Sequence, residues 1–258
     1  MDFGLNERCA LVTGSTQGLG RGIAEALAAE GAQVIITGRE TARAQAVARE
    51  LNGGAVGYGL DLGDTASVAA TLAALQREVG ALDVLVLNSG GPPPGPVVSV
   101  TAETWASQFQ AMMLSFFQIV AAVLPGMRER RWGRILISSS SGAVQPQAHL
   151  GISNTLRAGL LGWVKSLSNE VAGDGVTVNT LVPGRIQTRR LDQIDATAAR
   201  ATGRTVQEVV QASHEAIPAG RYGTPAEYGA VAAFLVSQQA SYITGAAIPV
   251  DGGFVRGL

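Results

Sequence analysis

Residues 9–30 read Cys-Ala-Leu-Val-Thr-Gly-Ser-Thr-Gln-Gly-Leu-Gly-Arg-Gly-Ile-Ala-Glu-Ala-Leu-Ala-Ala-Glu, and this stretch decides the fold. Residues 9–13 form a short apolar run with a β-branched end, which predicts a buried strand. A glycine-rich turn follows over residues 13–20, and residues 21–30 form a good helix sequence. Glycines permit a tight turn, and the helix N-terminus offers free N–H groups to a pyrophosphate. The succession predicts a dinucleotide site; a loop that merely needs glycines is the alternative.

Strand and helix patterns alternate along the rest of the chain. Because helical crossovers join parallel strands, the alternation predicts a doubly wound, Rossmann-type parallel sheet with helices on both faces. Seven strands and one domain spanning residues 1–258 are expected. The predicted strands cover residues 9–13, 33–37, 55–60, 82–87, 134–138 and 176–181, with the seventh inside 242–253. The predicted helices cover residues 21–30, 41–52, 101–124, 149–171 and 224–237, with another beginning near 64.

Residues 189–219 interrupt this alternation. They are polar, contain several arginines and are prone to form helices. They follow the carboxyl end of the sixth strand, so we expect an inserted substrate lid there. Residues 92–96, Pro-Pro-Pro-Gly-Pro, predict a stiff segment over the strand ends, and a ligand for a proline-recognising domain is the alternative.

The composition limits the class of protein. Hydrophobic residues make up 47% of the 258 and charged residues only 15%, so many helices must be buried on two faces or in a subunit interface. The net charge of −1 argues against nucleic acid. The single cysteine, Cys9, fits a reducing compartment and a buried position. The start has no apolar signal region, and residues 111–124 are too short to span a bilayer. A cytoplasmic protein without a membrane partner or metal site is expected.

Arg39 bears on the choice of cofactor. An acidic residue after the second strand selects the free 2′-hydroxyl of NAD, whereas this chain has Gly38-Arg39 there. The planar guanidinium is suited to pair with the 2′-phosphate of NADP, which favours NADP(H) over NAD(H). A solvated arginine at a strand end is the alternative.

The spacing Thr13-Gly14-x-x-x-Gly18-x-Gly20 resembles the short-chain dehydrogenase/reductase family, and most of all its bacterial 3-oxoacyl-acyl-carrier-protein reductases. The other good matches are residues 183–188 and 242–253, while residues 88–91, Asn-Ser-Gly-Gly, match the family's Asn-Asn-Ala-Gly in part. The resemblance covers nearly the whole chain. It implies an NAD(P)-dependent oxidoreductase that acts on a small-molecule or acyl-thioester carbonyl, and a homotetramer, which the two wide apolar helices at 101–124 and 149–171 also favour.

The resemblance implies a set of cofactor contacts along the strand ends. Asp61 would accept a hydrogen bond from the adenine amino group, although a cap for the helix near Asp64 is equally open. Asn88 would brace the sheet beside the cofactor. The full expected set is Gly14, Ser15, Gln17, Gly18, Leu19, Gly20, Arg39, Asp61, Leu62, Asn88, Gly90, Arg157, Pro183, Gly184, Ile186 and Thr188.

The family's catalytic tetrad of Ser, Tyr, Lys and Asn is mostly replaced. The Ser position falls on Ser139, although any serine of 138–141 would fit. The Tyr, Lys and Asn positions fall on Ser153, Arg157 and Met112. A serine hydroxyl is a far weaker acid than a phenol, and arginine stays protonated. Arg157 can still neutralise a developing alkoxide and hold ribose hydroxyls.

Other proton donors near this turn are scarce. His149 is the ionisable group with a suitable pKa, and a cap or surface role is its alternative. The four tyrosines, Tyr58, Tyr222, Tyr228 and Tyr242, are all expected to lie away from the serine turn. Three functions remain open: a carbonyl reductase with an atypical proton path, a cofactor-binding sensor or partner subunit with little turnover, and a non-redox lyase or isomerase.

Overall fold

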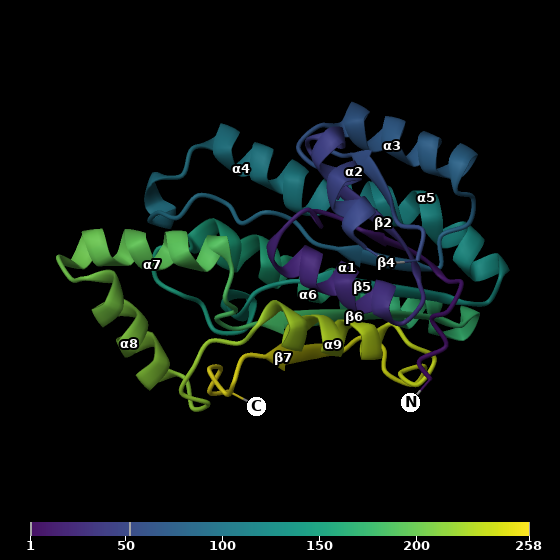
Figure 1. Ribbon diagram of the computed structural model, residues 1–258. Helices are drawn as coiled ribbons and strands as arrows, with labels where there is room; N and C mark the ends of the chain where they lie inside the picture. The colour runs from purple at the N-terminus through teal and green to yellow at the C-terminus, as the bar shows by residue number, and fades with distance from the viewer. Residues whose placement is uncertain (1, 52, 258) are drawn as a thin grey trace.

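The computed structural model describes residues 2–51 and 53–257, and the strands of this part form one seven-stranded parallel sheet in the order β3-β2-β1-β4-β5-β6-β7 (Figure 1). This confirms the predicted fold class. Apolar, β-branched runs make the central strands, because both faces of a parallel sheet are covered. The strands are β1 Cys9–Val12, β2 Gln33–Gly38, β3 Val56–Gly59, β4 Val84–Leu87, β5 Gly133–Ser138, β6 Val176–Pro183 and β7 Ala247–Val250.

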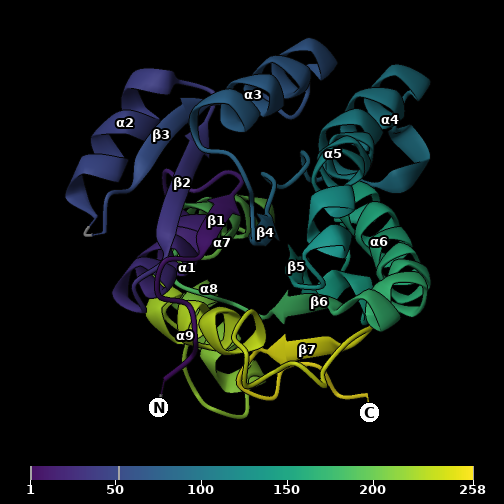
Figure 2. The same cartoon turned by 90° about the vertical axis from the view of Figure 1, so that its right-hand side faces the viewer.

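Helices cover both faces of the sheet. Figure 2 shows α3, α5 and α6 on one side and α1, α2 and α9 on the other, and each group forms its own apolar core with the sheet. Successive β5 residues alternate between the two cores, with Ile135 and Ile137 in one and Leu136 in the other. The helices are α1 Gly18–Ala29, α2 Thr41–Glu50, α3 Thr65–Glu78, α4 Ala102–Phe109, α5 Ser115–Glu129, α6 Gly151–Val171, α7 Arg189–Thr202, α8 Val206–Ala216 and α9 Pro225–Leu235.

Several helix ends differ from the predictions. Helix α1 begins inside the glycine-rich turn, three residues before the predicted start, and α6 begins at Gly151 because His149 has a left-handed φ of 59°. Helix α2 ends at Glu50, and the predicted end at Asn52 lies outside the described residues. Cys9 is buried as expected, and burial raises the pKa of its thiol to about 11.

The helix predicted over residues 101–124 is longer than expected. Helix α4, a π-helical turn at Gln110–Leu114 and α5 run on continuously to Glu129, with Pro125 inside α5. Packing outweighs the lost N–H of Pro125, because Met127 beyond it is fully buried. By length and composition alone, the continuous helix Ala102–Glu129 is long and apolar enough to cross a membrane, although residues 111–124 by themselves are too short. Its inner side packs on the sheet as core helices do.

Residues 189–219 contain two helices, as their helix-prone sequence indicates. Helices α7 and α8 pack on each other beyond the carboxyl ends of the strands, at the left of Figure 1. A small separate core of Leu191, Ile217 and Tyr222 lies beneath them. The insertion is therefore a structured hairpin at the same sheet edge as the glycine-rich turn.

Candidate active site

The glycine-rich turn is fixed from below by hydroxyl groups. Thr13 Oγ1 donates to the Asn88 carbonyl at 2.7 Å and accepts from the Asn88 N–H at 2.8 Å. Ser15 is fully buried, with its Oγ donating to the Val12 carbonyl and accepting from the Thr37 N–H. The turn is thus tied to β1, β2 and β4, and the Ser15 hydroxyl, expected among the cofactor contacts, is committed to this bracing.

The amino end of α1 has the features of an anion site. Its first residue follows Gln17, whose side chain caps no N–H, and the first turn contains no acidic residue. Gly18 adopts a left-handed φ of 61°, and a Cβ on Gly20 would lie 2.5 Å from the Gly14 carbonyl oxygen. The uncapped N–H groups and the positive end of the helix dipole are therefore directed at the turn, where a pyrophosphate fits.

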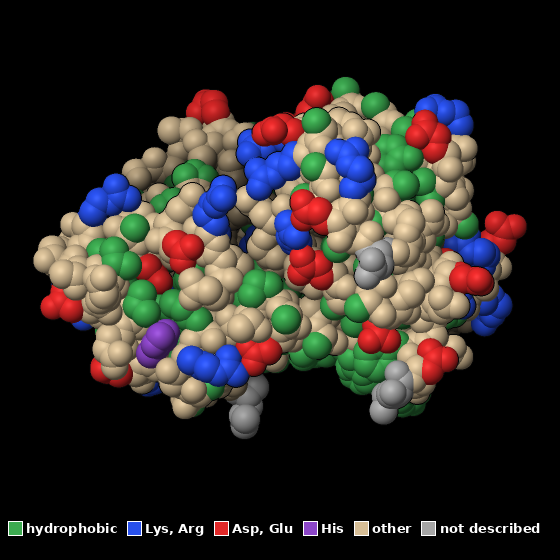
Figure 3. Space-filling model, viewed as in Figure 1, with side chains coloured by type: hydrophobic (Ala, Val, Ile, Leu, Met, Phe, Trp, Pro, Cys, Tyr) green, Lys and Arg blue, Asp and Glu red, His purple; other side chains and the backbone are tan. Residues whose placement is uncertain are grey.

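Two arginines lie beside this turn. Arg39 is exposed directly after β2, and Arg43 on α2 donates from Nη2 to Gln17 Oε1 at 3.1 Å. Figure 3 shows Lys and Arg side chains on both sides of a hollow between the α7 end of the molecule and α1 and α2. Sequence analysis missed Arg43, although its place four residues after Arg39 in a helix that begins at Thr41 is a usable signal.

The other expected cofactor residues line the same sheet edge. Asp64, and not Asp61, caps α3 by accepting from the Ala66 N–H at 2.9 Å, which excludes the cap role for Asp61. Asp61 is exposed and accepts from the Gly63 N–H, with Leu62 half-buried beside it. Asn88 Nδ2 donates to the carbonyls of residues 13 and 14, which confirms its bracing role.

Residues 183–188 leave β6 along a second fixed path. The Gly184 N–H donates to the Val250 carbonyl at 3.0 Å, and Ile186 pairs with Gly223 in a parallel bridge. Thr188 caps α7 by accepting from the Leu191 N–H at 3.3 Å. This segment therefore connects the sheet edge rigidly to the α7–α8 hairpin.

The four serines after β5 have different partners. Ser140 accepts from the Gly142 N–H, and Ser141 accepts from the side-chain amide of Gln147 at 2.7 Å. Ser138 Oγ lies 3.0 Å from the Tyr228 hydroxyl. The Ser139 side chain is buried, and its Oγ has no hydrogen-bond partner among the described residues. Ser139 alone of the four thus retains a hydroxyl free for a substrate.

Ser153, Arg157 and Met112, which the resemblance assigns to the tetrad positions, lie on elements beside this serine turn. Ser153 and Arg157 occupy consecutive turns of α6, with 8% and 5% of their surfaces exposed. Arg157 Nη1 donates to the Ser138 carbonyl at 2.7 Å, and burial lowers the pKa of its guanidinium to about 10, so it stays protonated at neutral pH. Met112 is buried in the π-helical turn, where it contributes only apolar surface.

The expectation that no tyrosine lies near the serine turn is wrong. Tyr228 on α9 is fully buried and contacts Ser138 from the opposite face of the sheet, although 90 residues separate the two in sequence. Burial raises the pKa of the Tyr228 phenol well above its usual range. It is therefore a fixed neutral partner of Ser138, and nothing in the local sequence around residue 228 signals this contact.

The proline segment lies over the strand ends as predicted and is held at two points. The Gly95 N–H donates to the His149 carbonyl at 2.7 Å, and Arg190 Nη2 on α7 donates to the Pro92 carbonyl at 3.0 Å. His149 itself is exposed on a left-handed residue. The segment thus bridges from the start of α6 to the start of α7 across the substrate side.

Asp195 joins the α7–α8 hairpin to the rest of the molecule. Its carboxylate is buried between Arg185 Nη1 at 3.1 Å and the Tyr222 hydroxyl at 2.8 Å.

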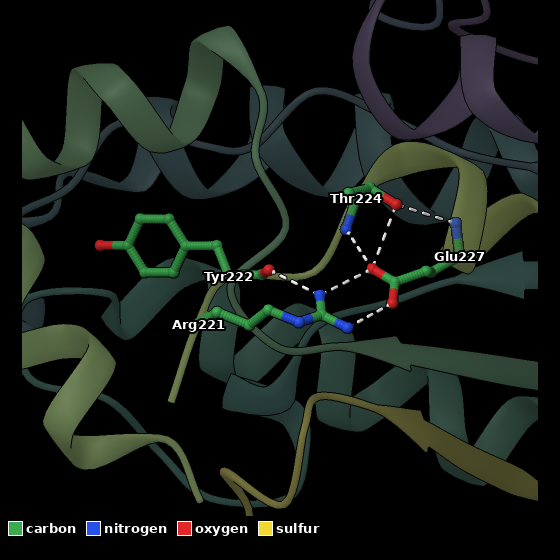
Figure 4. A network of polar contacts seen from close by, with 4 residues as sticks. All are labelled: Arg221, Tyr222, Thr224 and Glu227. Carbon is green, nitrogen blue, oxygen red and sulfur yellow. Dashed lines mark hydrogen bonds and ion pairs between the residues drawn. The ribbon is translucent and has the colours of Figure 1, made fainter. Parts of the chain in front are cut away.

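A second polar network lies next to Tyr222, whose side chain extends away from it (Figure 4). In this network Arg221 pairs with Glu227, and Glu227 completes a capping box with Thr224. Hydrogen bonds, above all from Arg221, lower the pKa of Glu227 to about 2.

Comparison with known proteins extends over nearly the whole chain. The protein-family model described as Enoyl-(Acyl carrier protein) reductase matches residues 14–255. The 3-oxoacyl-[acyl-carrier-protein] reductase FabG of Vibrio cholerae is 37% identical over 251 residues, which are 96% of this chain and 98% of that protein.

Solved structures give the same result. L-sorbose reductase from Gluconobacter frateurii, complexed with NADPH and L-sorbose, superposes with a TM-score of 0.94 at 29% identity and full coverage of both chains. A single-substitution variant of actinorhodin polyketide ketoreductase, with NADPH, has a TM-score of 0.92 at 30% identity, covering 97% of this chain and 98% of that one.

Proposed function

Because the chain belongs to the short-chain dehydrogenase/reductase family, in the group matched by the Enoyl-(Acyl carrier protein) reductase model, it is an oxidoreductase, and we propose that it reduces a ketone with NADPH. One observation carries the proposal. The uncapped amino end of α1 and the free hydroxyl of Ser139 lie at the carboxyl ends of the strands, with only β4 between β1 and β5, so a nucleotide site and a carbonyl-binding hydroxyl share this side of the sheet.

The chain's own residues divide the work as follows. The turn from Gly14 to Gly20 and the start of α1 hold the pyrophosphate, and residues 183–188 position the nicotinamide, which supplies a hydride when bound. Ser139 donates a hydrogen bond to the substrate oxygen. Arg157 is positively charged and donates to the carbonyl of Ser138, the residue before Ser139. From there it stabilises negative charge on the substrate oxygen without exchanging a proton.

The substrate side favours an acyl-type ketone such as a 3-oxoacyl thioester. Val97 and Val98 after the proline segment are 50% and 92% exposed, and Val144 after the serine turn is 46% exposed. Val97 packs against Gly151 at the start of α6, so these apolar side chains flank the entrance. The α7–α8 hairpin is the lid over them.

The test is NADPH consumption, followed by absorbance, against a panel of 3-oxoacyl thioesters and ketoses. We expect slow but saturable consumption with the thioesters. NADPH binding without consumption on any carbonyl would favour the second candidate, a cofactor-binding sensor, which the replacements at Ser153, Arg157 and Met112 support.

We propose that Arg39 and Arg43 together bind the 2′-phosphate of NADP. Arg39→Ala is expected to raise the Kd for NADPH about 10- to 100-fold, because a charged hydrogen bond is lost, and to leave the Kd for NADH unchanged. Fluorescence titration measures both. Arg49→Ala, at the far end of α2, is the matched control. Equal loss for both nucleotides would contradict the assignment.

We propose a homotetramer that covers the outer side of Ala102–Glu129. Phe109 and Leu114 are 38% and 42% exposed there, and β7 is an edge strand. A second copy, rather than a bilayer, is the expected cover, because the other side of this helix is packed on its own sheet.

Light scattering at micromolar concentration is expected to give a tetramer for the wild type and smaller species for Phe109→Glu with Leu114→Glu. Val206→Glu, on α8 with 43% exposure, is the control that should stay tetrameric. A monomeric wild type would refute the proposal.

A further inference from the structure

Two buried hydroxyls without partners lie at the ends of neighbouring strands. β4 and β5 pair in parallel up to Leu87 opposite Ile137, and Ser89 and Ser139 each follow that pair by two residues, so the two serines leave neighbouring strand ends at matching positions. The Oγ atoms of both serines are buried and have no hydrogen-bond partner among the described residues. Counting in steps of two from Leu87 and Ile137 places both on the α5 and α6 face of the sheet.

Neighbouring strands lie about 4.8 Å apart, close enough for facing side chains to share a ligand. No hydrogen bond joins Ser89 to Ser139. A buried hydroxyl without a partner is costly, and proteins rarely tolerate two side by side unless water or a ligand satisfies them. One oxygen atom held between them would satisfy both.

The neighbouring helices leave the hydroxyls of Ser89 and Ser139 without hydrogen-bond partners among the described residues. On the same face, Met112 is apolar and the buried Arg157 side chain donates to the Ser138 carbonyl, so neither satisfies the two serine hydroxyls. The Gln110 side chain in the π-helical turn also has a buried nitrogen without a partner among the described residues.

We propose that Ser89 is a second substrate-binding hydroxyl of the active site, and that Ser89 and Ser139 together hold the carbonyl oxygen of the ketone, or a water molecule before it binds. This inference rests on the proposed ketone reduction. Two hydroxyl donors on one oxygen stabilise the negative charge that develops there, which partly replaces the missing phenol. Neither donor ionises near neutral pH, so neither adds a step to the pH profile.

The test compares Ser89→Ala with Ser237→Ala. Ser237 follows α9, is fully buried, and also has an unpaired Oγ within the described part of the chain, but its carbonyl accepts from Arg134 at the start of β5, at the opposite edge of the sheet. If neither hydroxyl binds a ligand, the two alanine variants should have the same kcat/KM. We expect Ser89→Ala to lower kcat/KM for the ketone about 10-fold, the effect of one hydrogen bond, with unchanged Kd for NADPH and unchanged Tm.

Ser89→Thr, which keeps the hydroxyl, is expected to restore most of the activity. Ser89→Ala with the same kcat/KM as Ser237→Ala would overturn the proposal. A crystal structure decides the matter even if the wild type reduces no ketone and the proposed function fails. An oxygen atom within hydrogen-bonding distance of both Oγ atoms supports the inference. The absence of any water or ligand oxygen between the two Oγ atoms overturns it.

Discussion

Replacing Ser153 with Tyr and Arg157 with Lys in one chain is expected to raise the turnover of a 3-oxoacyl thioester by about 10²–10⁴-fold, the usual contribution of general-acid catalysis. The cofactor end is already built, with α1 uncapped and residues 183–188 fixed. The proposed site therefore already brings cofactor and ketone together, and the expected gain comes from supplying a proton donor.

The two changes must be made together. Arg157 is buried with its Nη1 on the Ser138 carbonyl, and its protonated guanidinium cannot pass a proton to a phenol at position 153. A lysine at 157 offers a compact ammonium one turn from that phenol and lowers its pKa. Each single variant is expected to gain little, so the pair should be strongly non-additive.

Single-turnover and steady-state rates of NADPH oxidation measure the gain. Thr155→Tyr with Arg157→Lys is the matched control, because Thr155 is exposed on the same helix and its phenol would face solvent. Met112→Asn is the third step. A wild type that already turns over near ~10 s⁻¹ would show the assignment to be wrong, and His149→Ala would then be the next variant to measure.

The fold was predictable because its signals are local. Apolar runs such as residues 84–87 and 135–137 repeat with helical segments between them, and connection handedness leaves few arrangements. The errors in the helix ends come from tertiary packing. Burial of Met127 allows α5 to continue beyond Pro125, and the left-handed conformation of His149 makes α6 begin later than predicted. Neither effect has a signature within a short window of sequence.

The parts of the candidate site that the backbone forms, such as the glycine-rich turn, were predictable from the sequence. The parts that depend on side chains from distant elements were less so. The glycine spacing indicates the turn correctly, but Ser15 contributes its hydroxyl to bracing. Tyr228 on α9 contacts Ser138 across 90 positions of sequence, and Ser89 and Ser139 follow neighbouring strands that pair up to Leu87 and Ile137. Such relations depend on the assembled sheet and have no signal in a short window of sequence.

Loss of the Asp195 carboxylate is expected to release the α7–α8 hairpin while the sheet stays intact. Asp195 is 2% exposed, and it is the buried acceptor for both Arg185 and Tyr222. Removing one partner of a buried charged network costs about 3 kcal/mol, which corresponds to roughly a 100-fold shift in a local opening equilibrium. Otherwise the small core of Leu191, Ile217 and Tyr222 and the hydrogen bond from Arg190 to the Pro92 carbonyl hold the hairpin.

Hydrogen exchange measures this opening directly. In Asp195→Ala, amides of residues 189–216 are expected to exchange about 100-fold faster, while those of β1 and β4 keep their wild-type rates. The KM for the ketone should rise if the hairpin is the substrate lid that we propose. Asp192→Ala is the control: Asp192 lies on the same helix, exposed, with only the Gln187 side chain as its partner. Exchange in Asp195→Ala that matches this control would mean that helix packing alone holds the hairpin, because the buried carboxylate would then add nothing to its closure.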